Sequence, residues 1–252
     1  MALVIAKSNR KTYRRCVFAL GALLSFAPVC LGQSVRKPDP IDIPSYSTKA
    51  TTIYDNKSAT SPDGKKKVSI RRLQVRAEDT MQPAELVVRS EKTRLSATTR
   101  FGLDAEVLWS PDSLAFSLTG SREGANGQYG TDVFYIRGGG LVKIELNSLL
   151  ETTFGHPVKC AWPEVPNVGA ILWLVPSEKL LVAAEIVHHS VCDSFGTFRA
   201  YAVDLTGPRI VATYDQLEAK RLYRRDLGGE LLQADNSCIR DPKSCWVMGN
   251  HQ

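Results

Sequence analysis

The stretch Leu108–Ser117, LWSPDSLAFS, places a tight-turn signal between two short apolar runs. Proline presets the φ angle of the first central residue of a β-turn, and the aspartate after it can accept hydrogen bonds from nearby backbone amides. The same centre occurs earlier as Ser61-Pro62-Asp63-Gly64, and an apolar strand candidate follows each copy. The repeated Ser-Pro-Asp therefore predicts the corner of a repeated structural unit.

The second copy of this turn is Ser110-Pro111-Asp112-Ser113, and a weaker third copy surrounds Pro176. In the third copy Trp173 precedes the turn, as Trp109 precedes the second, but no aspartate follows the proline. The intervals between the prolines suit one propeller blade plus insertions.

Between the turns the chain alternates short apolar runs with Gly, Pro, Asn or Asp, which is typical of an antiparallel all-β architecture. The predicted strands are 67–73, 84–89, 94–99, 105–109, 114–119, 133–136, 141–146, 170–174, 180–187, 198–204 and 210–214.

At these residues the chain resembles the TolB-type WD40-like (PD40) repeat family of periplasmic β-propellers, whose blades carry a Ser-Pro-Asp-Gly turn followed by an apolar strand. The resemblance covers roughly residues 59–204 and includes 131–136 as the next strand of the second copy. It implies a propeller-like fold and a habit of binding other macromolecules, and it brings no catalytic residues.

The length of the repeat region limits the number of blades. Residues 59–214 hold about three blades of ordinary length, whereas closed propellers have four to eight. We therefore expect a small or irregular β-propeller-like antiparallel repeat domain, closed by the lead-in 33–58 and by the C-terminal part 215–252. A β-sandwich that uses the same turn is the alternative. An amphipathic helix is predicted from about Asp215, and Gly228-Gly229 should end or kink it.

The first 32 residues have the layout of a secretory signal peptide, with five basic residues before the apolar segment 16–27 and a proline at its end. Cleavage is expected after Gly32, which predicts a periplasmic or secreted protein without stable membrane insertion. The whole chain has a net charge of +6. Without those five charges, 27 basic side chains stand against 26 acidic ones, so the composition does not favour a nucleic-acid partner.

Four cysteines lie beyond the predicted cleavage site: Cys160, Cys192, Cys238 and Cys245. An oxidising compartment favours disulfides, and the short polar loop between Cys238 and Cys245 favours that pair, with Cys160 then bonded to Cys192. A metal site with His188, His189 or His251 is the alternative, but Cys-x-x-Cys and His-x-x-x-His spacings are absent.

Two further patterns resemble catalytic or phosphate sites and are discounted. His188 and His189 precede Ser190, Cys192 and Asp193, yet the sequence has no Gly-x-Ser-x-Gly elbow. The glycine-rich segment 124–130 lacks the lysine of a phosphate loop and suits a hairpin tip.

The lysines around the first turn have two interpretations. The basic cluster 65–67 with Arg71, Arg72 and Arg76 is interpreted first as a solvated hairpin edge. The rim formed by the turns, with Lys65 and Lys66, is the predicted partner-binding surface. The sequence thus predicts an exported, non-enzymatic protein that binds a protein partner and needs no cofactor. A hydrolase using His188 or His189 and a structural accessory of the cell envelope are the alternatives.

Overall fold

In the computed structural model of the 252-residue chain, the described residues are 45–54, 57–72, 84–102, 104–121, 128–154, 165–186 and 196–233. The predicted signal peptide, all four cysteines of the predicted disulfides, Arg76, and His188, His189 and His251 lie outside them.

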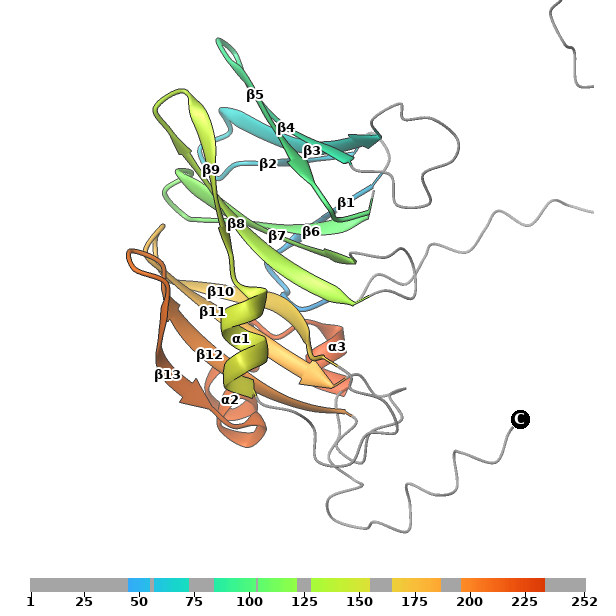
Figure 1. Cartoon of the computed structure of the whole chain (residues 1–252), viewed down its shortest axis with the longest axis vertical. Coiled ribbons are helices and arrows are strands. Elements are labelled where there is room, and N and C mark those ends of the chain that lie inside the picture. Colours follow the sequence, from blue (N-terminus) through green and yellow to red (C-terminus); the bar gives the residue numbers. More distant parts are fainter. Residues whose placement is uncertain are drawn as a thin grey trace, which may run out of the picture. The chain divides into compact units, whose positions relative to one another are not determined.

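Three antiparallel sheets follow one another along the chain (Figure 1), and each contains four strands in a meander. The first sheet has the order β2-β3-β4-β5, with β2 Ser58–Thr60, β3 Lys66–Arg72, β4 Ala84–Ser90 and β5 Arg94–Thr99. The second sheet has the order β1-β6-β7-β8-β9, with β1 Thr51–Ile53, β6 Ala105–Trp109, β7 Ala115–Ser121, β8 Tyr129–Arg137 and β9 Gly140–Glu145. The third sheet has the order β10-β11-β12-β13, with β10 Asn167–Val175, β11 Lys179–Ile186, β12 Thr197–Asp204 and β13 Arg209–Tyr214.

The sheets pack face to face through two apolar clusters. Val68, Ile70, Leu86 and Val88 of the first sheet share one cluster with side chains of the second sheet, among them Phe116. Side chains that point to the other side of the second sheet share another cluster with the third sheet. Alternate residues of a strand point to opposite faces, so the second sheet is apolar on both of its faces and its strands β6 and β7 are buried throughout.

The outer face of the third sheet is covered by the C-terminal helices and by the end of the lead-in. Leu181 and Ala183 of β11 pack with Tyr46 and with residues of α2 Gln216–Tyr223 and α3 Gly229–Gln233. We call the lead-in segment Ser45–Ala50 the strap. Its Ser47 forms a β-bridge with Leu227, between the two helices. A helix long and apolar enough to span a membrane does not occur among the described residues.

Two glycines allow the strap to sit where it does. A Cβ atom on Gly169 would lie 2.0 Å from Cγ of Tyr46, and one on Gly228 would lie 2.1 Å from the carbonyl oxygen of Ser45. Any side chain at either position would displace the strap, so these glycines are required for close backbone approach.

The fold class is confirmed: the chain is a small, open, propeller-like array of antiparallel sheets with C-terminal helices. The three sheets rule out the two-sheet sandwich for the described chain. Each predicted strand is present, with ends that differ by a few residues. The lead-in supplies β1, which pairs with β6 of the second sheet. The helix predicted from Asp215 ends at Tyr223, and a second helix begins at Gly229.

Two details differ from the sequence interpretation. Strand β3 lies between β2 and β4 at Lys67, Val68 and Ser69, so the interpretation of Lys67 as part of a hairpin edge is wrong, whereas Arg71 lies beyond the residues that pair with β2. Helix α1 Asn147–Phe154 was not predicted from the sequence; it follows β9 and buries Leu150 in the cluster between the second and third sheets.

Candidate functional site

The three proline turns occupy equivalent places in the fold. Each joins the first and second strands of a meander: β2 to β3, β6 to β7, and β10 to β11. The first two turns close with a hydrogen bond from the backbone amide of Gly64 to the Ser61 carbonyl, and from Ser113 to Ser110. In the third, the amide of Glu178 donates to the Val175 carbonyl. The third turn therefore occupies the same place in its sheet, but its conformation differs: its left-handed residue is Ser177, the third residue of the turn, whereas Gly64 and Ser113 are fourth residues.

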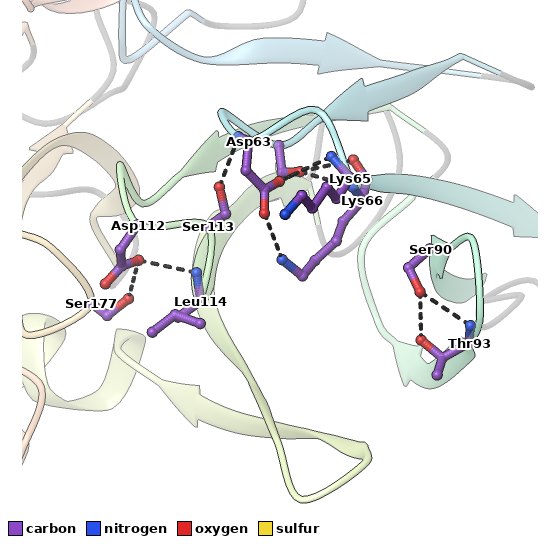
Figure 2. Close-up of polar contacts among 10 residues, drawn as sticks. Asp63, Lys65, Lys66, Ser90, Thr93, Asp112, Ser113, Leu114 and Ser177 are labelled. Carbon is purple, nitrogen blue, oxygen red and sulfur yellow. Dashed lines mark hydrogen bonds and ion pairs between the residues drawn. The ribbon is translucent and has the colours of Figure 1, made fainter.

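Hydrogen bonds between neighbouring turns tie the three corners into one rim (Figure 2). The backbone amide of Asp63 donates to Oγ of Ser113, at 3.1 Å. The hydroxyl of Ser177 in the third turn donates to Oδ1 of Asp112 at 2.7 Å. The amide of Ser177 donates to Oγ of Ser110 at 2.8 Å. These three hydrogen bonds connect the first turn to the second and the second turn to the third. The three turns therefore form a single surface.

Both linking serines have a left-handed backbone, with φ of 61° at Ser113 and 53° at Ser177. Glycine is the usual residue for such a conformation, and Gly64, with φ of 72°, occupies the place in the first turn that Ser113 has in the second. A non-glycine residue in this region costs roughly 1–2 kcal/mol. The serine hydroxyls offset that cost because each of them makes a contact between sheets.

Two tryptophans tie the first strands of adjacent sheets below the rim. Nε1 of Trp109 donates to the carbonyl of Ala59 at 3.3 Å, and Nε1 of Trp173 donates to the carbonyl of Leu108 at 3.0 Å. Each indole thus reaches back to the preceding sheet. The tryptophan before the second and third turns is part of the repeat.

The carboxylate of Asp63 acts within its own turn. The Ser61 hydroxyl, the backbone amide of Lys65 and the Lys66 ammonium group, 3.1 Å away, all bind it. The hydrogen bond from Ser61, followed by the one from Lys65, holds the pKa of Asp63 well below its usual range. Of the two predicted partner-binding lysines, Lys66 therefore stabilises the turn, whereas Lys65 is exposed and carries a free ammonium group within the described chain.

The second corner presents an apolar side chain beside the charges. Asp112 is occupied by the Ser177 hydroxyl and by the backbone amide of Leu114. Burial raises the pKa of Asp112, but these hydrogen bonds outweigh it and the pKa is lowered. The Leu114 side chain is 54% exposed although its backbone is fixed by that bond and by the amide of Ile136, which donates to the Leu114 carbonyl.

The connections between the second and third strands of the sheets are longer in sequence than the turns of the rim. Segments 73–83, 122–127 and 187–195 join the second strand to the third in each sheet, and all lie outside the described residues. They include most of the glycine-rich segment 124–130 and the histidines of the alternative hydrolase site. Among the described residues, no group of three His, Cys, Asp or Glu side chains could hold a metal ion.

Comparison with family models gives no match, and neither curated proteins nor solved structures include a match to this chain. The resemblance to the TolB-type repeat family thus rests on the turn residues quoted above.

Proposed function

We propose that this protein is an exported, non-enzymatic binding module that captures a protein partner at the rim of its turns. The main support for the proposal is that hydrogen bonds between neighbouring sheets connect the three turns into one surface. Rigid loops on a β scaffold are common binding surfaces, because the strands fix their positions while their sequences vary.

The side chains on the rim suit a protein partner. Leu114 is a large apolar side chain that is held in place yet open to solvent, and Lys65 is an exposed cation that follows the neighbouring corner. A central apolar anchor with charged neighbours is typical of the energetically important part of a protein interface.

Site-specific crosslinking tests the proposal directly. A photo-crosslinking amino acid at position 114 should give a discrete adduct with a protein of the cell envelope. Position 217 is the matched control, because Leu217 is a comparably exposed leucine on α2, away from the rim. The photo-crosslinking amino acid at that position should give no adduct. Equal adducts at both positions, or none at position 114, would contradict the proposal.

Substitutions on the rim give the second test. Lys65→Glu combined with Leu114→Asp should reduce the yield of the captured partner while changing stability by less than about 0.5 kcal/mol, because both side chains are exposed. The matched control is Arg224→Glu combined with Leu217→Asp. Lys66 is left unchanged, because its loss would remove an ion pair with Asp63 from the turn itself.

The competing hydrolase predicts a different result. Replacing His188 and His189 by alanine would then abolish a hydrolytic activity without changing partner capture. Loss of stability alone would indicate that the two histidines are structural.

A further inference from the structure

The two end sheets of the array differ in what covers their outer faces. Helices and the strap cover the third sheet, whereas no described helix packs on the first sheet. Its inward positions, such as Val68 and Leu86, are buried against the second sheet. The alternate positions on β3, β4 and β5 therefore point away from the array.

Four basic residues occupy this outward side: Lys67, Arg71, Arg89 and Arg94, which we call the cationic face. All four are exposed. The strand register pairs Lys67 with Arg89 and Arg89 with Arg94, so three cations form one row across three adjacent strands. Neighbouring strands are about 4.8 Å apart, and like charges directly opposite each other destabilise a sheet.

Only one acidic side chain belongs to the strands of this sheet. Glu85 forms ion pairs with Arg71 and, at 3.5 Å, with Arg94. Within the described chain, neither Lys67 nor Arg89 forms an ion pair. The row of cations thus has too few carboxylates to balance it.

The imbalance belongs to the first repeat alone. Residues 58–100 contain ten Lys and Arg against five Asp and Glu, whereas residues 101–154 contain three against seven. A chain that is nearly neutral beyond its first fifteen residues therefore separates its charges between two neighbouring sheets. Solubility alone would be served by mixed charges on every surface, so this separation needs another reason.

We propose that the cationic face binds an acidic polysaccharide. Arginine guanidinium groups bind carboxylate or sulfate groups through paired hydrogen bonds. Exposed hydroxyl groups that can bind sugar hydroxyls lie on the same side of the sheet, at Thr98 of β5 and at Ser58 and Thr60 of β2, the strand beside Lys67.

The composition of the face disfavours other polyanions. The strands carry no aromatic side chain on which the bases of a single-stranded nucleic acid could stack. Val87 is the only large apolar residue at an outward position on these strands, and it is buried, so no apolar group is available to enter a membrane or to anchor a protein partner.

Binding to polygalacturonate, measured by calorimetry with the purified protein, tests the proposal. We expect binding that weakens as salt is added, and no binding to neutral dextran. Arg89→Thr combined with Arg94→Thr should weaken binding at least tenfold. Arg89→Thr alone should melt at a slightly higher temperature than the wild type, because it relieves the row of like charges and Arg89 forms no ion pair within the described chain.

The matched control is Arg221→Thr combined with Arg224→Thr, which removes two exposed charges from α2 and its C-terminal end. An equal loss of binding in this variant would mean that net charge alone attracts the polymer, and would overturn the proposal. If oligo-dT or anionic lipid vesicles bind more tightly than polygalacturonate, with the same dependence on Arg89 and Arg94, the proposed polysaccharide is wrong. The ligand of the cationic face would then be a nucleic acid or a membrane. The partner capture at Leu114 is independent of each of these outcomes.

Discussion

Replacing Glu185 by glutamine should flatten the dependence of stability on pH. Glu185 lies on β11, points toward the strap and the helices, and is 1% exposed. Burial raises its pKa to about 8, and the negative charge of Glu230 adds to the shift, while the Tyr46 hydroxyl and Lys220 oppose it. Glu106 on β6 is also buried, and burial raises its pKa to about 7 although its carboxylate accepts the backbone amide of Tyr46.

The sign follows from proton binding in the two states. Between the unfolded pKa of about 4.5 and the folded value, the folded protein keeps a proton on Glu185 that the unfolded chain has lost. The free energy of unfolding therefore falls as the pH rises through this window, by roughly 1.4 kcal/mol per pH unit for one such group. Glutamine does not titrate, so the wild type should lose about 3 kcal/mol relative to the variant between pH 5 and pH 7.

Urea unfolding of both proteins at several pH values between 5 and 8 measures this difference. Glu178→Gln is the matched control, because it makes the same chemical change at an exposed position. A difference between wild type and Glu185→Gln that does not change with pH would refute the reasoning, since it would mean that Glu185 is already ionised in the folded protein at pH 5.

Four further predictions concern the strap, the N-terminal cap of α2, the cleavage of the signal peptide and the disulfide between Cys238 and Cys245. Gly169→Ala should lower the unfolding free energy by about 3 kcal/mol, measured in urea, because its methyl group would overlap the Tyr46 ring. Asp215→Ala should cost about 1 kcal/mol, because Asp215 caps α2 by accepting the amide of Glu218; a melting temperature equal to the wild type would contradict this. N-terminal sequencing of the exported protein should begin at Gln33, and a chain that begins at Met1 would exclude cleavage. Peptide mapping without reductant should recover Cys238 bonded to Cys245, whereas free thiols at both positions would exclude that bond.

The strand pattern was predictable from the sequence because most strands are long apolar runs bounded by turn residues. The bounds of β5 and β6 coincide with the prediction, since Gly102 and the proline turn end the runs clearly. Strands β1 and β2 were missed because three residues rich in Thr and Ser give no periodic signal. Their pairing depends on the neighbouring strands and not on their own residues.

The site was predictable only in part. The turn residues indicated the corners, but the sequence could not show that Ser113 and Ser177 would join them, because those contacts depend on how the sheets stack. Leu114 was assigned to a strand, and its exposure follows from the position of the turn. The cationic face was missed because it depends on which basic residues of β3, β4 and β5 are paired, and the sequence pattern alone does not give that register.

The strap can reach its place in the fold only after the distant C-terminal helices have been synthesised. Thr48 binds the carbonyl of Arg225, which follows it by 177 residues, and the amide of Gly228 binds the carbonyl of Tyr46. The strap therefore cannot complete its contacts until a segment about 180 residues further along the chain has been made, and contacts between such distant residues form slowly. Until α3 is synthesised, the apolar outer face of the third sheet has no complete cover, and an interrupted chain would expose that face as a target for chaperones and proteases.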